Sequence, residues 1–488
     1  MSSGKDGDRP AISRRRFLRG AMGLSGAALL PGVLAACGAP APQAGQATSA
    51  PTGATAAPAA PAATTAPAAT TTLRILALNW PQTPVEQKLA DADFTPKTGI
   101  KVVIDATPYQ FLEQRVKQLV GAQSADYDIY HYDSQWIGGF VAAGALERLD
   151  TPEFLGASDA QIKADDFFPE LTYRLGRYPT IEADLVAGKY DPSIPIYGLP
   201  WSLNCEVLWY RKDLISTPPK TWAEVREVAK TLTKNGMYGM AVSGTRLSDF
   251  FTVEYLPRLW SLGGELWDAT NWKAEGVLNS PKSVAALQMM RDMVAVDKSV
   301  DPASGNWGLD ERLAALLQGK AAMALNWVPL FGGIAEDPKS STVVGKLAYA
   351  PSPAGEGGQF AMYGCQGTGI NAFSNNKAAA WQYLQWLESK ETQQKLVDEP
   401  SAGYVSARKD LKDYAAGKSE WQRVFVESIP MVRDMWNNSC YAELLDIMGR
   451  EGNLAYIGQK TAEQALNDAA VAQQVVLDSC PENPKNKA

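Results

Sequence analysis

Histidine is nearly absent from this chain of 488 residues, since His131 is the only one. A zinc site built on several histidines is therefore excluded, and a Ser-His-Asp triad would have to use this residue. His131 lies near the end of the predicted strand 127–132. We expect it to pack in the fold at the end of a strand.

Long apolar runs are missing after residue 36, which excludes a transmembrane helix in the rest of the chain. The formal charge of the whole chain is −7. Residues 1–36 hold six basic and two acidic side chains, so without them the formal charge is near −11. An acidic surface without basic blocks offers no footprint for nucleic acid or anionic lipid.

The first 37 residues combine two export signals. Arg14 and Arg15, followed by Phe17 and Leu18, resemble a twin-arginine signal. Residues 20–36 carry no charge and are short for a membrane span, as in the apolar core of a signal peptide. Residues 34–37 read Leu-Ala-Ala-Cys, which matches a bacterial lipobox.

We therefore predict that residues 1–36 are a twin-arginine lipoprotein signal peptide. Cys37 is then acylated and anchors the protein to the cell membrane on its extracytoplasmic side. The alternative is an ordinary secreted protein in which Cys37 merely follows small residues. Residues 38–72 contain only Gly, Ala, Pro, Gln, Thr and Ser. Such a composition cannot bury enough apolar surface to fold, so we expect residues 37–72 to form a lipidated, disordered tether.

From residue 73 onward, the hydrophobic pattern alternates between strands and helices, which predicts an α/β fold with mostly parallel sheets. Helix 109–121 should place Phe111, Val116, Leu119 and Val120 inward. The predicted strands are 73–78, 101–105, 127–132, 346–350 and 369–373, and the predicted helices are 85–94, 109–121, 136–143, 222–233, 250–262, 283–294 and 378–389.

The middle of the chain is rich in helices, and the strand–helix rhythm returns after residue 346. This order predicts two lobes, each formed by segments that are separated in the sequence, with the chain passing several times from one lobe to the other. We assign residues 73–204 plus 351–400 to lobe one and residues 205–350 plus 401–480 to lobe two. Ligand sites in such sheets lie beyond the carboxyl ends of the strands. Trp80 follows the first strand and Asp133 follows the third, so both should face one crevice.

Four segments in order resemble family 1 extracellular solute-binding proteins, which include the maltose-binding proteins of ABC importers. Together they cover nearly all of residues 73–410. They are Asp126-Tyr127-Asp128-Ile129 through Gly144-Ala145-Leu146, Tyr197-Gly198-Leu199-Pro200-Trp201 through Glu224, Leu317-Gln318-Gly319-Lys320-Ala321-Ala322-Met323 with Asn326-Trp327, and Gly369-Ile370-Asn371-Ala372-Phe373 through Leu384.

The resemblance implies a two-lobed, periplasmic-binding-protein-like fold in which each lobe has a mixed, mostly parallel sheet flanked by helices. The lobes would close on a solute by hinge motion. It also implies a monomeric receptor, without cofactor, metal or catalytic residue, that hands a carbohydrate to the transmembrane subunits of an ABC permease. Sugars need aromatic platforms for their C–H faces and polar groups for their hydroxyls. The 14 tryptophans of the chain suit such a site.

The expected ligand-binding residues are those that fall where the resemblance or the strand ends place the cleft. For several of them, packing in the core is the alternative, and for Asp133 it is an N-cap. The set is Trp80, Tyr109, Asp133, Trp201, Glu254, Tyr255, Trp327, Tyr363, Arg433 and Trp436.

Cys205, Cys365, Cys440 and Cys480 remain once Cys37 is acylated, and four cysteines allow three connectivities. We predict Cys440–Cys480, within one C-terminal helical region, and Cys205–Cys365, between two segments that the resemblance places beside the hinge. Four buried free thiols are the alternative. Residues 151–196 form a longer insertion than compact relatives have, and we expect its tyrosines (Tyr173, Tyr178 and Tyr190) to extend or narrow the cleft.

Three other functions compete with a carbohydrate receptor. The solute could be an amino acid, a peptide, a polyamine or a metal. An exported glycoside hydrolase would need paired carboxylates, for which Asp133 and Glu254 are available. A surface adhesin or assembly factor on the same scaffold is the third.

Overall fold

The structure is a computed structural model that describes residues 71–486. The predictions for the signal peptide, for Cys37 and for most of the tether lie outside these residues. The described residues all belong to one compact unit. None of its helices combines the length and the apolar character that a membrane span requires.

The first sheet has five strands in the order β2-β1-β3-β12-β4. β1 pairs in parallel with β2 and with β3, whereas β12 runs antiparallel to β3 and to β4. The near-continuous burial of β1 is typical of a parallel strand covered on both faces. The strands are β1 (Thr72–Leu78), β2 (Lys101–Thr107), β3 (Ile129–Asp133), β4 (Leu199–Ser202) and β12 (Gln366–Ile370).

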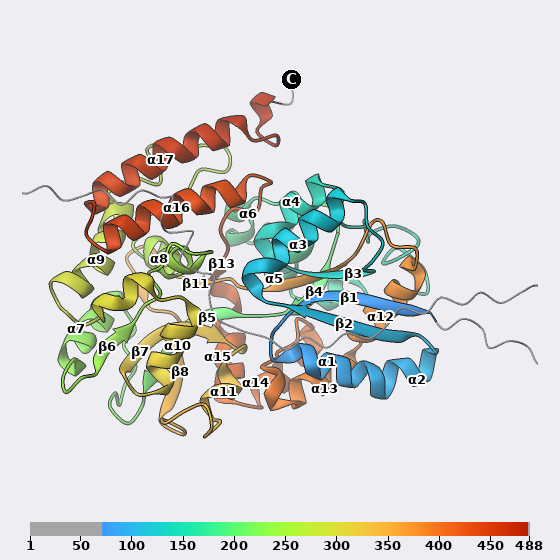
Figure 1. Ribbon diagram of the computed structural model, residues 1–488, viewed down its shortest axis with the longest axis horizontal. Coiled ribbons are helices and arrows are strands. Elements are labelled where there is room, and N and C mark those ends of the chain that lie inside the picture. Colours follow the sequence, from blue (N-terminus) through green and yellow to red (C-terminus); the bar gives the residue numbers. More distant parts are fainter. Residues whose placement is uncertain (1–70, 487–488) are drawn as a thin grey trace, which may run out of the picture. The chain divides into compact units, whose positions relative to one another are not determined.

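Helices pack on both faces of this sheet (Figure 1). Their bounds are α1 (Gln82–Leu89), α2 (Thr95–Thr98), α3 (Tyr109–Gly121), α4 (Ile137–Ala142), α5 (Pro169–Gly176), α6 (Glu182–Val186), α12 (Lys377–Leu387) and α13 (Lys390–Asp398). α3 has the predicted bounds, but Phe111 was wrongly expected to point inward, because it is 57% exposed. The buried stripe of α3 is instead Leu112, Val116 and Val120, at spacing of four residues.

The second sheet has four strands in the order β6-β7-β5-β8. β7 is parallel to β6, while β5 runs antiparallel to both of its neighbours. These strands are β5 (Cys205–Arg211), β6 (Tyr238–Ala241), β7 (Ala321–Val328) and β8 (Leu347–Ala350). Helices α7 (Trp222–Leu232), α10 (Leu309–Leu317) and α15 (Glu420–Ser428) pack on the sheet, and α11 (Gly332–Ala335) and α14 (Lys412–Ala416) are short.

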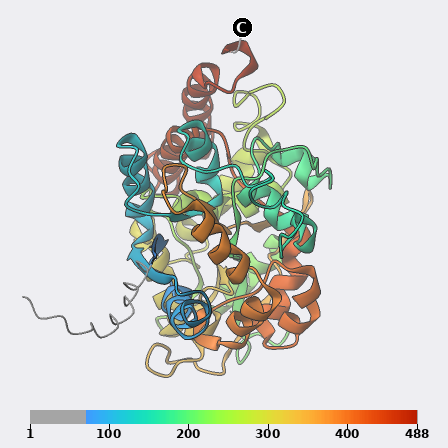
Figure 2. The ribbon, with the colours of Figure 1, turned by 90° about the vertical axis from the view of Figure 1, so that its right-hand side faces the viewer.

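Four further helices form a layer beside the second sheet: α8 (Phe250–Ser261), α9 (Pro281–Ala295), α16 (Tyr441–Tyr456) and α17 (Ala462–Ser479). In both views the C-terminal helices, coloured red, lie at the opposite end from the blue α1 and α2 (Figures 1 and 2). The predicted disulfide Cys440–Cys480 is present and joins the start of α16 to the end of α17.

The two sheets are linked by segments that cross between them. Leu203 and Asn204 connect β4 of the first sheet to β5 of the second. A second segment runs through β11 (Ala361–Met362) into β12, and β13 (Val432–Arg433) pairs with β11. The Asn204 carbonyl accepts from the Gly364 N–H at 3.0 Å, which ties two crossings together. The remaining strands, β9 (Ala354–Gly355) and β10 (Gly358–Gln359), form a small hairpin.

The predicted disulfide between Cys205 and Cys365 is wrong, because both thiols are free and buried. The register of the crossing segments explains this result. Cys205 pairs with Tyr363 rather than with Cys365. The Cys365 sulfur instead exchanges hydrogen bonds with the backbone of Asn204, at 3.4 Å to its N–H and to its carbonyl.

A carboxyl group lies in the core beneath the first sheet. Glu86 of α1 accepts a hydrogen bond from the Trp201 indole at 2.6 Å and another from the Tyr383 hydroxyl at 2.6 Å. His131 packs beside it and is fully buried, as predicted, but it lies in the middle of β3 rather than at the end of a strand. Burial raises the pKa of Glu86 to about 7 and lowers the pKa of His131. Both groups are therefore neutral in mildly acidic solution.

The buried Glu86 should make stability depend on pH. A carboxyl whose pKa rises from 4.5 to about 7 on folding stabilises the folded protein below pH 4.5 and loses this contribution as pH rises to about 7. At ~1.36 kcal/mol per pKa unit, the loss is about 3 kcal/mol. Glu86→Gln keeps an acceptor for Trp201 and a donor for Tyr383, so we expect urea unfolding of this variant to vary less between pH 5 and pH 8. Glu391→Gln, at an exposed position, is the control; identical pH profiles for Glu86→Gln and the wild type would contradict the assignment.

Candidate functional site

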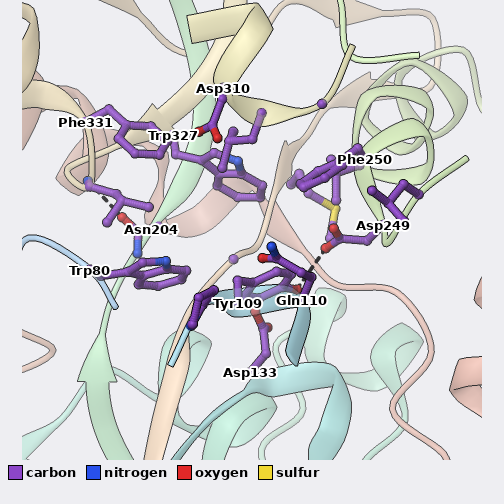
Figure 3. A pocket seen from close by; sticks show the side chains of 18 of the residues that line it. Trp80, Tyr109, Gln110, Asp133, Asn204, Asp249, Phe250, Asp310, Trp327 and Phe331 are labelled. Carbon is purple, nitrogen blue, oxygen red and sulfur yellow. Dashed lines mark hydrogen bonds between the residues drawn. The ribbon is translucent and has the colours of Figure 1, made fainter. Parts of the chain in front are cut away.

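A cleft of about 510 Å³ opens between the carboxyl ends of strands from both sheets. Figure 3 shows Trp80, Tyr109 and Asp133 on one side and Trp327, Phe331 and Asp310 on the other. The volume lies within the usual range for small-molecule sites. Rigid sheets thus present side chains from loops and helix starts toward one another.

The side formed by the first sheet follows from strand polarity. β1, β2 and β3 are parallel, so the segments after them meet at one edge. Trp80 follows β1, Tyr109 follows β2 and Asp133 ends β3. As predicted, Trp80 and Asp133 line the same crevice. Trp80 stacks on Tyr109 and on Trp201, with ring centroids 6.1 and 6.2 Å apart, so its indole is held in place from behind.

The opposite side is formed by the second sheet and its helices. Trp327 lies near the end of β7, and Phe331 follows it in the next loop. The Trp327 ring rests against the crossing segment at Gly364, where a Cβ atom would lie 2.2 Å from the ring. Only glycine at this position leaves room for the ring. The starts of α8 and α10 complete this side with Asp249, Phe250, Asp310 and Glu311.

Polar side chains connect the walls. The Tyr109 hydroxyl donates to Asp249 Oδ2 at 3.1 Å, which joins α3 of the first sheet to the segment before α8 (Figure 3). The Gln135 amide donates to the Tyr109 oxygen at 3.1 Å. The Gln366 amide donates to Asp133 Oδ2 at 3.1 Å. These amides and carboxyls are the groups that can bind hydroxyls of a solute.

Two carboxyls of the cleft, those of Asp133 and Asp249, are buried. Burial, together with the nearby Asp249 carboxyl, raises the pKa of Asp133 well above its usual range. Burial also raises the pKa of Asp249. Asp434, behind Ser134, has its pKa raised to about 7 by burial. None of the described residues that line the cleft is Lys, Arg or His.

Five of the ten predicted ligand-binding residues line the cleft: Trp80, Tyr109, Asp133, Trp327 and Tyr363. Tyr363 is fully buried, and its hydroxyl donates to the Leu171 carbonyl at 2.6 Å. Trp201 does not line the cleft, because its indole lies behind Trp80 and bonds to Glu86. Of the two readings of Trp201, the structure supports core packing.

Glu254 and Tyr255 were expected in the cleft, but the structure places both in the core of α8. The Tyr255 hydroxyl donates to the Ser283 carbonyl at 2.9 Å. Glu254 belongs to a fully buried ion network, in which Arg312 lies 2.7 Å from Glu254 and 2.6 Å from Glu206. Arg258 pairs with the other Glu254 oxygen at 3.0 Å. The pair Asp133 and Glu254 is therefore not assembled as the two carboxylates of a hydrolase.

Arg433 and Trp436 also point away from the cleft. Arg433 binds Glu265 at 2.8 Å and lies over the Trp260 and Phe360 rings. Trp436 is fully buried. From this segment, Met435 is the residue that lines the cleft. The expectation that these two side chains close over a ligand is thus corrected.

The insertion 151–196 contributes no residue to the lining of the cleft. Tyr173 and Tyr190 line a separate hollow beside α5, and Tyr178 lines another with Trp267 and Trp272. The expectation that the insertion extends or narrows the cleft is therefore not met.

Several lining residues were missed. The strand β6 was not predicted. The loop that follows it, which carries Asp249, was therefore not expected to lie at the carboxyl end of a strand beside the cleft. Gln110 and Gln135 are each one or two residues from predicted positions, and their side-chain directions could not be read from the sequence. Other missed residues that line the cleft include Asn79, Asn204, Phe250, Asp310, Glu311, Phe331, Met362, Gln366 and Met435.

Comparison with known proteins finds a family and several relatives that this chain resembles. A profile of the bacterial extracellular solute-binding proteins matches residues 79–394. The erythritol/L-threitol-binding protein of Mycolicibacterium smegmatis is 26% identical over 407 residues, which is 79% of this chain and 80% of that protein. The probable amino-acid ABC transporter periplasmic-binding protein y4oP of Sinorhizobium fredii is 27% identical over 307 residues, which is 61% of this chain and 64% of that relative. The latter match spans slightly less than two thirds of the relative's length.

Solved structures share the fold. Maltose-bound MalE3 of T. maritima has a TM-score of 0.70 and 23% identity, covering 83% of this chain and 99% of that one. The ribitol complex of an ABC transporter solute-binding protein from Agrobacterium radiobacter K84 has a TM-score of 0.70 and 25% identity, covering 83% and 98%. These likenesses confirm the predicted periplasmic-binding-protein-like α/β fold.

Proposed function

The chain belongs to the bacterial extracellular solute-binding proteins, the receptors of ABC transporters, and from this premise we propose that its solute is a carbohydrate or polyol bound in the cleft. The proposal is supported most strongly by the pairing of Trp80 and Trp327 on opposite walls of the cleft, with carboxyls and amides between them. Aromatic faces suit the C–H surface of a sugar, while the polar groups replace the water lost from its hydroxyls.

The solutes named for several of the similar proteins belong to this class, although y4oP is named for amino acids. The relatives include proteins named for erythritol or L-threitol and structures bound to ribitol and maltose. We propose a mono- or oligosaccharide or a polyol that is handed to the transmembrane subunits of an ABC permease. The receptor is proposed to act as a monomer without catalytic turnover.

We also propose that the protein is held at the membrane by an acyl chain on Cys37. The twin arginines and the Leu-Ala-Ala-Cys motif support export and lipidation. The lobe boundaries given above, with residues 73–204 plus 351–400 in lobe one, are part of the same proposal. Strands of the first sheet come from the first set of ranges, and strands of the second sheet come from residues 205–350.

A thermal-shift panel tests the proposed solute class. The purified protein is heated with monosaccharides, disaccharides, oligosaccharides, polyols, amino acids and polyamines. We expect one or a few sugars or polyols to stabilise it increasingly with concentration, by about 2.7 kcal/mol at 100 times Kd, without consumption of the compound. Unchanged melting temperatures with all sugars and polyols would contradict the proposal, and sugar hydrolysis lost in Asp133→Asn would favour an enzyme.

A further inference from the structure

The charge of the cleft is unbalanced. Four carboxyl side chains line it, and no described lining residue is basic. Two of them, Asp310 and Glu311, are exposed. The other two, Asp133 and Asp249, are only 4% and 8% exposed. Buried carboxyls normally have a cationic partner, so these two call for an explanation.

Some buried carboxyls elsewhere in the protein have such a partner. Glu206 and Glu254 bind Arg312 in the core, and Glu182 binds Arg174 at 2.8 Å. Neither Asp133 nor Asp249 forms an ion pair with any described residue. Buried carboxyls without a Lys or Arg partner also occur in the core, as at Glu86 and Glu388, but Asp133 and Asp249 line the cleft, where a bound solute can contact them.

The two buried carboxyls converge on the same place. The Tyr109 hydroxyl donates to Asp249 at 3.1 Å, and both Tyr109 and Asp249 are near enough to Asp133 to affect its pKa. One hydroxyl has a single proton, so it cannot satisfy both carboxylates. The other donors are neutral too: the Gln135 amide and the Ser248 hydroxyl donate to Asp249 at 3.5 and 3.3 Å, and the Gln366 amide and the Ser134 hydroxyl donate to Asp133 at 3.1 and 3.5 Å. Repulsion from the Asp249 carboxyl adds to burial in raising the pKa of Asp133.

Resting on the proposed function, we propose that the solute carries a protonated amine beside its hydroxyls and that Asp133 and Asp249 bind this ammonium group. The chemical class is an amino sugar or an amino polyol. An ammonium has three donors and one positive charge, so it can bind both carboxylates at once. The indoles of Trp80 and Trp327 add to the preference, because aromatic faces attract cations. A carboxylate or phosphate on the solute is disfavoured, because no described residue that lines the cleft is basic.

Matched ligand pairs test the inference. Isothermal titration calorimetry compares glucosamine with glucose, glucamine with sorbitol, and short chitosan oligosaccharides with their N-acetylated forms and with malto-oligosaccharides of equal length. We expect the amine in at least one pair to bind about tenfold or more tightly than its neutral match, and the preference to shrink as NaCl is raised. Equal or tighter binding of the neutral member of every pair that binds would overturn the inference and leave the proposed function standing. If no sugar or polyol of either kind binds, the proposed function fails together with the inference.

Variants assign the preference to the two carboxyls. In Asp133→Asn and in Asp249→Asn, the ratio between amine and neutral ligand should fall to about threefold or less, while the neutral ligand still binds. Asp413→Asn, an exposed position far from the cleft lining, is the control and should keep the ratio. Asparagine preserves the shape and keeps one of the two acceptor oxygens, and melting temperatures verify folding. A ratio unchanged in both cleft variants would show that other groups select the ligand.

Discussion

Truncation of Trp327 to alanine should weaken solute binding by about 30-fold. This factor corresponds to about 2 kcal/mol, the usual cost of losing a central aromatic contact. The Trp327 ring lies on the wall opposite Trp80 and is held against Gly364. Trp80→Ala should have a similar effect, because its ring is fixed by stacking on Tyr109 and Trp201.

Calorimetric titration of the best stabilising sugar or polyol measures these losses. Phenylalanine at position 80 or 327 should retain part of the affinity, since a smaller ring still covers the solute. Trp267→Ala is the matched control, because Trp267 lines a different hollow. Wild-type affinity in both Trp80→Ala and Trp327→Ala would rule out the two indoles as platforms.

Replacement of Arg312 by methionine should lower the free energy of unfolding by about 3–5 kcal/mol. Removing one partner of a buried ion pair leaves an uncompensated charge, which is the costly case. Arg312 is fully buried and binds Glu206, Glu254 and the Asn326 side-chain oxygen. Because α10 begins three residues before Arg312 and its first turn lines the cleft, solute affinity should fall as well.

Urea unfolding gives the magnitude, with Arg423→Met as the matched control. Arg423 pairs with Glu427 on the surface, where both side chains are about half exposed. Such pairs contribute about 1 kcal/mol or less. A loss below about 1 kcal/mol in Arg312→Met, equal to that of the control, would contradict the structural role of the buried network.

Strand polarity made one wall of the cleft predictable from the sequence. Trp80 and Asp133 were found because each follows a strongly apolar strand, and parallel strands end at one edge. The bounds of α3 were also readable from its pattern. The second wall was harder, since the short strand β6 has no comparable apolar run and its loop brings Asp249 to the cleft.

Other errors have local physical causes. α8 is buried on every side from Phe251 to Ser261, so its sequence has no polar face that could reveal where Glu254 points. Cys205 and Cys365 lie on neighbouring crossings, but only the register shows that Cys205 faces Tyr363. Phe111 was wrongly assigned to the buried face of α3. Phe111 and Leu112 are both apolar and adjacent, so the hydrophobic pattern alone could not decide which of them points inward.

A crystal structure of the protein with the most stabilising sugar or polyol tests the central claim most directly. We predict one solute molecule between Trp80 and Trp327, with hydrogen bonds to Asp133 or Asp249. Solute located only in another hollow, such as that lined by Trp267 and Trp272, would contradict the assignment of the binding site.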